Sequence, residues 1–267
     1  IFVFLLLIAS FMMIPMIFTV SNAFKPMDEI FLFPPRMIVQ NPTLDNFRDL
    51  FIIMSDSWVP FSRYLSNTLL ITIIGTIGHI ILASMAAYAL EKFEFPGKKI
   101  LFTSVVLSLM FAPQVTSIPS YLVISKLNMI DSLSSIIVPA LKGSLGLYLM
   151  KQFMVTVPDQ LLESSRIEGA SEWTILWKIV MPLVKPAWLT LMIFLIRDLW
   201  NASGGTYIFS EQLKTLPLAL SQLAGGGIAR SGVASAVTFI MIIVPVVAFI
   251  ITQSNVIETM STSGIKE

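Results

Sequence analysis

The sequence contains no cysteine, a single histidine and few charged residues. Without cysteine the chain has no disulfide framework, no thiolate metal ligand and no thiol nucleophile. A single histidine argues against a histidine-based metal centre, so no metal site is expected. Charged residues make up 12% of the 267 positions, whereas a soluble domain carries about a quarter. The formal net charge of +1 argues against nucleic acid as a partner.

Hydrophobic residues make up 55% of the chain and gather into long runs. No soluble fold of this size could bury so much apolar surface, so the sequence predicts an all-α integral membrane protein. Pro113 and Pro119 predict a broken or kinked helix within the third run. Six transmembrane helices are predicted, over about residues 1–20, 66–90, 100–122, 136–153, 184–199 and 233–252.

These runs divide the chain into four parts. The parts are a first transmembrane helix at 1–23, an external loop at 24–62, a transmembrane core at 63–253 and a tail at 254–267. Because the first run begins at Ile1 without methionine, we expect a short N-terminal segment to be missing. The external loop is predicted to contain an amphipathic helix over 43–51. A glycine-rich loop is predicted over 200–231.

The chain lacks the residue patterns of an enzyme. Gly97-Lys98-Lys99 has neither the upstream glycine nor the hydroxyl residue of a phosphate-binding loop, so the chain cannot hydrolyse ATP alone. A Ser–His pair would have to use His79, which lies among isoleucine and glycine residues. We interpret His79 as a hydrogen-bonded histidine packed between helices, because polar groups inside membranes find partners.

One polar stretch, residues 156–186, still shows helical patterning. Thr156 and Asp159 have the spacing of a capping box, which predicts the start of a short helix. Gly169 predicts the end of that helix, because glycine accepts the backbone conformation of a tight turn. A second helix is predicted to follow, with one face formed by Trp173, Leu176, Trp177 and Val180. The stretch is therefore a predicted helix–turn–helix between two membrane spans.

The same stretch carries a motif with fixed spacing. Glu163-Ser164-Ser165 is followed by Gly169 after three residues, by Ile179 after nine more and by Pro182 after two more. This pattern resembles the cytoplasmic EAA loop of ABC importer permeases, which reads E-A-A, three residues, G, nine residues, I, one residue, L-P. The chain departs from the pattern in two places. Serines replace the alanines, and Met181 replaces the leucine before the proline.

The resemblance implies the type I ABC importer permease fold, with six transmembrane helices and a cytoplasmic coupling helix–turn–helix over 156–182, here called the coupling loop. It places the chain in the carbohydrate branch, similar to the maltose-type second permease. Trp173 and Trp177 are then expected to tie the coupling loop to its own spans, and Glu163 to meet a basic group on an ATPase or to cap the loop. The residues implied to couple to the ATPase are Glu163, Ser164, Ser165, Gly169, Ala170, Ile179 and Pro182.

The resemblance also implies an assembly in the bacterial cell membrane. Its members would be this chain, a homologous second permease, two ATPase subunits and an extracellular solute-binding protein. ATP and magnesium are expected on the ATPase subunits, with no cofactor in this chain. The implied function is ATP-driven, binding-protein-dependent import of an oligosaccharide, and the tail at 254–267 is expected in the cytoplasm.

Two further sets of residues are candidates for contacts in such an assembly. Polar or aromatic groups in or near spans mark a candidate substrate path, because they are costly there. These substrate-path candidates are Asn67, Gln114, Trp200 and Asn201. Arg197 and Asp198, which are adjacent, are predicted to pair with each other or to extend their charged groups to the membrane surface. The candidates for contact with the binding protein are Gly204, Gly205, Gly225, Gly226 and Gly227.

Two other classes of function stay open on the residues alone. A secondary, ion-coupled transporter of a small polar solute would need paired broken helices and intramembrane carboxylates. Asp198 is the only acidic residue near a span interior, which counts against that class. An intramembrane hydrolase would need a Ser–His or metal pair, and the chain offers no convincing one.

Overall fold

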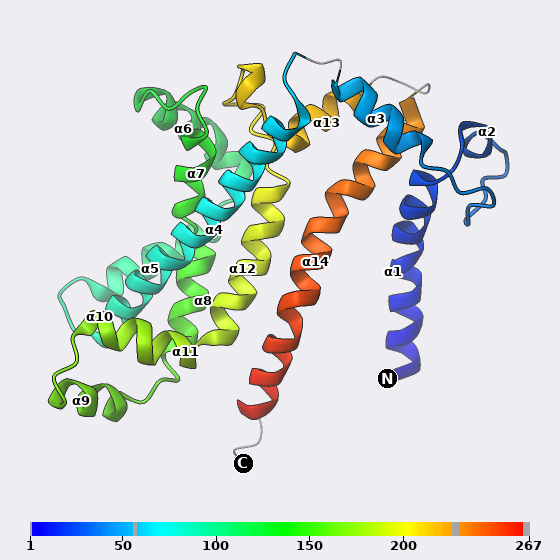
Figure 1. Cartoon of the computed structure of the whole chain (residues 1–267). Coiled ribbons are helices and arrows are strands. Elements are labelled where there is room, and N and C mark those ends of the chain that lie inside the picture. Colours follow the sequence, from blue (N-terminus) through cyan, green and yellow to red (C-terminus); the bar gives the residue numbers. More distant parts are fainter. Residues whose placement is uncertain (1, 56–57, 226–229, 264–267) are drawn as a thin grey trace. The chain divides into compact units, whose positions relative to one another are not determined.

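The computed structural model describes residues 2–55, 58–225 and 230–263, and all regular secondary structure in these ranges is helical (Figure 1). This confirms the predicted all-α class. The helices before the coupling loop are α1 (Phe2–Ala23), α2 (Met27–Ile30), α3 (Asp45–Ser55), α4 (Phe61–Lys92), α5 (Lys98–Ser108), α6 (Pro113–Lys126), α7 (Ser134–Leu141) and α8 (Ser144–Met154). The later ones are α9 (Asp159–Ile167), α10 (Glu172–Thr174), the π-helix η1 (Ile175–Val180), α11 (Met181–Leu183), α12 (Lys185–Trp200), the 3-10 helix η2 (Glu211–Leu213), α13 (Leu216–Ala224) and α14 (Ser231–Ser263).

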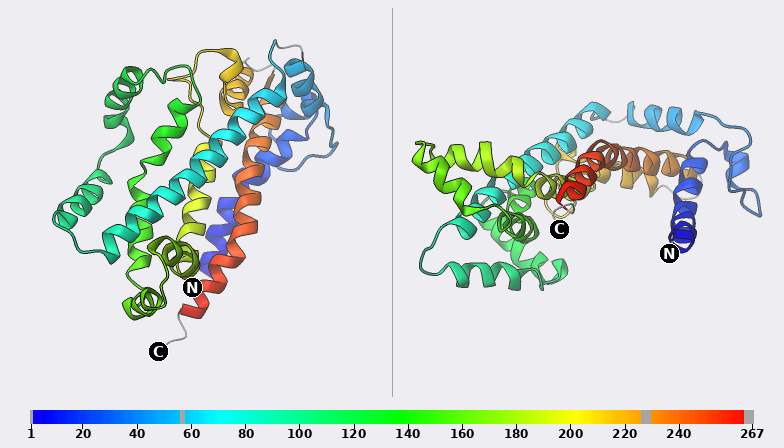
Figure 2. Two further views of the ribbon diagram at one scale, coloured as in Figure 1. Left: turned by 60° about the vertical axis from the view of Figure 1, so that its left-hand side comes forward. Right: turned by 90° about the horizontal axis from the view of Figure 1, so that it is seen from below.

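Three of the described helices are long and apolar enough to cross a membrane, namely α1, α4 and α14. The last of these remains one continuous helix in both views of Figure 2, although it contains Pro245. Two bent helix pairs raise the number of candidate spans to as many as five. In one pair α5 and α6 meet at 112°, and in the other Glu172–Leu183 meets α12 at 82°. The first of these bends confirms the broken third span predicted from Pro113.

The predicted fourth span, residues 136–153, is two helices rather than one. α7 ends and α8 begins at Lys142-Gly143, where Gly143 has the extended conformation of a helix N-cap (φ −60, ψ 111). Hydropathy did not reveal the break, because the apolar run continues on both sides of it. Each half is too short to count as a span, so the predicted number of six transmembrane helices is not confirmed.

The described residues form two compact units. The first comprises the chain up to Thr68, Trp200–Gly205 and Phe209–Val246. Its core is built on Trp200, which is 1% exposed and donates its indole N–H to the Met241 carbonyl at 3.2 Å. The predicted amphipathic helix is α3, whose Leu50 is fully buried in this core.

The predicted glycine-rich loop at 200–231 contains a helix, α13, that the sequence analysis missed. Its signals were present locally. The Thr215 hydroxyl accepts a hydrogen bond from the Leu218 N–H at 3.4 Å, Pro217 occupies the first turn, and Gly225 follows the last residue. A threonine cap, an early proline and a terminal glycine together are a helix signature. The glycines elsewhere in the segment favoured a loop, so this helix was not predicted.

The second unit, Leu69–Leu199 with Thr206–Ile208 and the chain from Val247, contains the coupling loop. Its His79 is 1% exposed, and His79 Nδ1 donates to the Ala140 carbonyl at 2.7 Å. This confirms the interpretation of His79 as a hydrogen-bonded histidine packed between helices. The ring fits only because Gly146 and Gly143 have no side chains, since a Cβ at either position would overlap it. Small residues at such positions allow helices to approach closely in a membrane.

We expect the Gly146→Ala variant to be less stable by about 1–3 kcal/mol, because the added methyl group would overlap the His79 ring. Thermal unfolding of the purified chain in detergent measures the loss. The double variant His79→Ala, Gly146→Ala is the matched control, because the ring is gone and the second change should then cost much less. Equal costs of Gly146→Ala in both backgrounds would contradict the packing described.

Candidate functional site

The first helix of the coupling loop, α9, ends in a Schellman turn. The Ala170 N–H donates to the Ser165 carbonyl at 3.0 Å, and the Gly169 N–H donates to the Arg166 carbonyl at 3.0 Å. Gly169 has φ +84, the left-handed conformation that this turn requires. The predicted turn at Gly169 is therefore present, and its backbone angle explains the choice of glycine.

The second helix begins with Ser171 as its N-cap and continues as a π-helix. Ser171 Oγ accepts a hydrogen bond from the Thr174 N–H at 3.3 Å. A π-helical stretch, η1, follows at Ile175–Val180, so side chains no longer recur every 3.6 residues. Trp173, which precedes this stretch, is 60% exposed, which contradicts the expectation that it ties the loop to its own spans. Trp177 is partly buried against the core, as expected.

The inner side of the coupling loop is apolar and closely packed. Leu162 of α9 is 1% exposed, and Ile175 and Val180 of η1 are fully buried. They belong to one cluster with Ala87 of α4 and Met154 of α8. Burying side chains of this size stabilises the contact by about 1.5–3 kcal/mol each. The coupling loop is therefore seated on the ends of α4 and α8.

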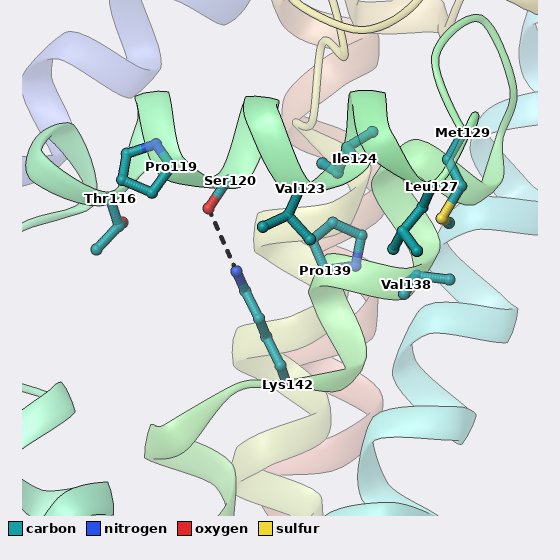
Figure 3. A pocket seen from close by; sticks show the side chains of 10 residues that line it. All are labelled: Thr116, Pro119, Ser120, Val123, Ile124, Leu127, Met129, Val138, Pro139 and Lys142. Atoms are coloured by element: carbon teal, nitrogen blue, oxygen red, sulfur yellow. Dashed lines mark hydrogen bonds between the residues drawn. The ribbon is translucent and has the colours of Figure 1, made fainter.

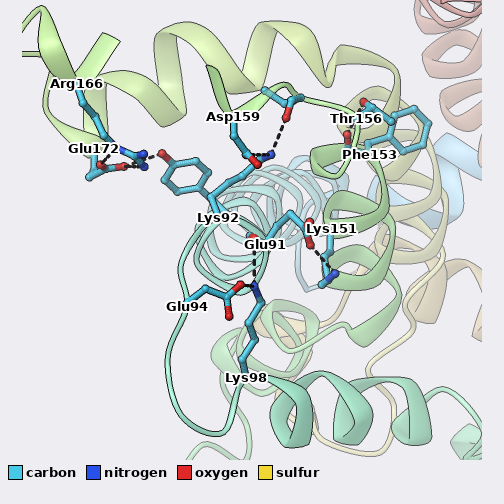
Figure 4. Close-up of polar contacts among 12 residues, drawn as sticks. Glu91, Lys92, Glu94, Lys98, Lys151, Phe153, Thr156, Asp159, Arg166 and Glu172 are labelled. Atoms are coloured by element: carbon cyan, nitrogen blue, oxygen red, sulfur yellow. Dashed lines mark hydrogen bonds and ion pairs between the residues drawn. The ribbon is translucent and has the colours of Figure 1, made fainter. Parts of the chain in front are cut away.

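The start of α9 is held by a lysine rather than by the predicted capping box. Lys92 Nζ lies 2.7 Å from Asp159 Oδ1 and 2.6 Å from the Val157 carbonyl (Figure 4). The N-cap position of α9 is Pro158 and not Thr156, and Thr156 Oγ1 instead donates to the Phe153 carbonyl at 2.7 Å. The hydrogen bond from the Lys92 ammonium holds the pKa of Asp159 below its usual value.

A second polar cluster joins both helices of the coupling loop to α4. Arg166 Nε donates to Glu172 Oε1 at 2.7 Å, and the Tyr88 hydroxyl donates to Glu172 Oε2 at 2.6 Å. The hydrogen bond to Glu172 raises the pKa of Arg166 above its usual value. Beside it, Lys151 of α8 and Glu91 of α4 pair at 2.6 Å (Figure 4). The last turns of α4 thus contact α8, α9 and α10 through charged side chains.

The outer side of the coupling loop carries exposed charge and apolar surface. Glu163, Ser164 and Gly169 are exposed, and Glu163 makes no hydrogen bond or ion pair with any residue that the structure describes. Ile167 is 88% exposed and lies in the same helix. A single exposed apolar side chain such as Ile167 needs no explanation, but Ile167 lies in the same helix as the exposed motif residues.

The predicted coupling residues do not all lie on this outer side. Ser165 is 8% exposed, and its hydroxyl donates to the Leu161 carbonyl at 2.8 Å. Ala170 and Ile179 are partly buried against the core cluster, whereas Pro182 is exposed. The motif therefore combines surface positions with positions that seat the loop. The roles of these residues in coupling remain predictions.

Sequence reasoning missed Tyr88, Lys92, Arg166 and Glu172 as parts of this site. The one available signal was charge on Asp159 and Glu172, which indicated that basic partners were needed somewhere in the chain. Charge alone does not specify which pairs form.

The substrate-path candidates differ in how exposed their side chains are. Asn67 is 2% exposed and donates to the carbonyls of Gln212 and Lys214, so its amide shapes the backbone there. Trp200 is buried in the core of the first unit, and its indole has no exposed face in this conformation. Gln114 and Asn201 are exposed. Gln114 belongs to the second unit and the other three residues to the first, and the role of all four remains a prediction.

Of the glycines proposed to contact a binding protein, Gly204, Gly205 and Gly225 lie in the described part of the chain. Gly204 has φ +66, and Gly225 ends α13. Gly226 and Gly227 lie outside the described residues. Arg197 and Asp198 pair at 2.8 Å, as predicted. Among the described residues no cluster of three or more histidine, cysteine, aspartate or glutamate side chains could hold a metal ion.

Comparison with known proteins identifies several relatives, although no family model matches the chain. The sn-glycerol-3-phosphate transport system permease protein UgpE of Yersinia enterocolitica is 31% identical over 179 residues, which are 67% of this chain and 60% of that protein. The chain thus matches about three fifths of the length of such relatives. The arabinooligosaccharides transport system permease protein AraQ of Halalkalibacterium halodurans is 26% identical over 273 residues, 99% of this chain and 94% of that protein.

The fold has a solved counterpart. A crystal structure of a bacterial ABC transporter involved in the import of the acidic polysaccharide alginate contains a chain that matches with a TM-score of 0.78. The sequence identity is 20%, and the match covers 94% of this chain and 93% of that one. At this identity the match shows the fold, which this chain shares with that chain of the ABC transporter.

We expect Tyr88→Phe to destabilise the chain by about 1 kcal/mol, because the buried Tyr88 side chain loses its part-buried hydrogen bond to the Glu172 carboxylate. Thermal unfolding of the purified protein measures this. Tyr148→Phe is the matched control, because its ring stacks on Phe102 and no hydrogen bond of its hydroxyl is found among the described residues. If the two variants unfold at the same temperature, the contact at Glu172 contributes nothing.

Proposed function

We propose that the chain is a carbohydrate-type permease subunit of an ATP-driven, binding-protein-dependent ABC importer, because its relatives are transport system permease proteins and its fold matches a chain of an ABC importer. Its relatives are transport system permease proteins, and three of its described helices are long and apolar enough to cross a membrane, which supports a location in the bacterial cell membrane and a role in transport. The observation that supports the proposal most is the coupling loop, whose motif residues lie on a helix–turn–helix seated on α4 and α8.

We assign the outer side of the coupling loop to contact with an ATPase subunit. Glu163 is exposed and has no described partner, so it is available for a basic group on that subunit. Ile167 and Trp173 supply exposed apolar surface next to it. Aromatic residues with a charged rim are typical of protein interfaces. The rest of the assembly is a second permease, a second ATPase subunit and an extracellular solute-binding protein, with ATP and magnesium held by the ATPase subunits.

The coupling mechanism follows from how the loop is attached. When two ATPase subunits close on ATP, the loop moves with the surface that holds it. The apolar contacts of the loop with α4 and α8, together with the polar contacts of Lys92 and Glu172, transmit that motion to α4. The membrane helices then change between inward-facing and outward-facing states. ATP drives this change only by binding one state better than the other.

An oligosaccharide is the proposed solute. Support comes from the arabinooligosaccharide permease that matches almost the whole chain. The external loop at 24–62 is proposed to lie on the side of the binding protein. The coupling loop within the core at 63–253 and the tail at 254–267 are proposed to lie in the cytoplasm.

We expect Gly169→Val to abolish ATP-driven transport and to weaken co-purification of the ATPase. A β-branched residue at φ +84 is strongly disfavoured, so the Schellman turn must rearrange and displace the outer side of the coupling loop. Tagged chain is purified from native membranes, and the ATPase subunits and ATP hydrolysis recovered with it are measured.

Gly97→Val is the matched control. Gly97 has φ +91 and open space around it, so the backbone strain is similar but lies outside the coupling loop. We expect this control to keep the ATPase subunits bound. Normal ATPase recovery and transport with Gly169→Val would contradict the proposed contact.

A further inference from the structure

The second unit contains a cavity that the coupling mechanism does not use. It has a volume of about 420 Å³ and lies between α6 and α7, with Lys142 at one end (Figure 3). Sites for small molecules typically enclose roughly 300–1,000 Å³, so the size suits part of a solute. The walls are mostly apolar and include Pro119, Val123, Val138 and Pro139.

Lys142 is the feature that distinguishes this cavity from an ordinary packing defect. It is the only charged residue between Leu133 and Met150, a stretch otherwise suited to a membrane. The residue stands where α7 stops, and the backbone break before α8 lets its side chain reach towards α6. The Lys142 side chain is exposed on this chain, and a charge within such an apolar run of a membrane protein is costly and usually functional.

The Lys142 ammonium is only partly satisfied by the protein. Its Nζ donates to Ser120 Oγ at 3.4 Å, which is long for a hydrogen bond. No ion pair joins Lys142 to a carboxylate within the described part of the chain. An ammonium group has three N–H donors, so at least two remain for a ligand.

The other polar groups of the cavity favour a polyhydroxy ligand. The Ser120 and Thr116 hydroxyls line the cavity on the α6 side, and both can bond to ligand hydroxyls. The Pro139 ring on α7, opposite these hydroxyls, offers flat apolar surface to the face of a sugar ring. No carboxylate lines the cavity, so its charge is positive.

We propose that this cavity binds the oxyanion of an acidic, polyhydroxy solute, with Lys142 as the counter-charge. The oxyanion is a carboxylate or a phosphate on a sugar-like body, and the two share the same chemistry towards an ammonium group. The inference rests on the proposed importer function and deepens it, because it assigns a charge to the transported solute. It also makes Lys142 a specificity-determining residue.

The absence of cysteine allows a direct test. Ser120→Cys places a single thiol on the full chain, 3.4 Å from Lys142 in the parent structure. In opened native membranes, the thiol is labelled with an anionic or a cationic methanethiosulfonate reagent, and the rates are read by mass spectrometry of the purified chain. We expect the anionic reagent to react faster, and Lys142→Met to lower its advantage by about tenfold.

Lys126→Met is the matched control, because this lysine ends α6 and does not line the cavity. It should leave the rate ratio unchanged. Added trigalacturonate or glucose 6-phosphate should slow the labelling, and whichever protects better identifies the carboxylate or the phosphate as the favoured oxyanion. Neutral maltotriose should protect much less.

Three results would overturn the proposal. They are equal protection by maltotriose, a rate ratio that does not depend on Lys142, and a thiol that no reagent reaches in the assembly, which would mean that a partner subunit fills the cavity. The labelling requires neither ATP nor an ATPase subunit. Failure of the importer function would therefore appear in the co-purification experiment and not in this one.

Discussion

The Glu172 carboxylate is the contact on which the geometry of the coupling loop depends. It accepts hydrogen bonds from Tyr88 of α4 and from Arg166 of α9, while Glu172 itself begins the second helix of the loop. One carboxylate therefore joins three segments. Without it, α9 would be held by the apolar contacts of the loop with α4 and α8 and by Lys92 alone. A loop that is to move membrane helices must be attached firmly, and this cluster supplies the polar part of that attachment.

Much of the site follows from local sequence. The turn at Gly169 was predictable, because a left-handed turn after a short helix favours glycine. The motif spacing then located the loop. By contrast, the partner of Asp159 was not predictable, because Lys92 is 67 positions away and one of several lysines in its region. The exposure of Trp173 was also missed, and so was the π-helix after it, which cannot be recognised from a 3.6-residue pattern.

The fold shows the same division between local and long-range information. Composition gave the all-α membrane class, and prolines gave the bend between α5 and α6. Hydropathy missed the break at Lys142-Gly143, since apolar residues continue through it. The burial of Trp200 was also not predictable. Its place at a span end made it a substrate-path candidate, and tertiary packing buries it in the core of the first unit.

The most direct test of the central claim is crosslinking from the outer side of the coupling loop. Glu163→Cys places one thiol there on an otherwise cysteine-free chain, and Trp58→Cys, at an 81% exposed position in the proposed external loop, is the control. Bifunctional crosslinking in native membranes, followed by mass spectrometry, identifies the neighbour. The account predicts an ATPase subunit at position 163 and none at position 58. An ATPase adduct at both positions or at neither would contradict it.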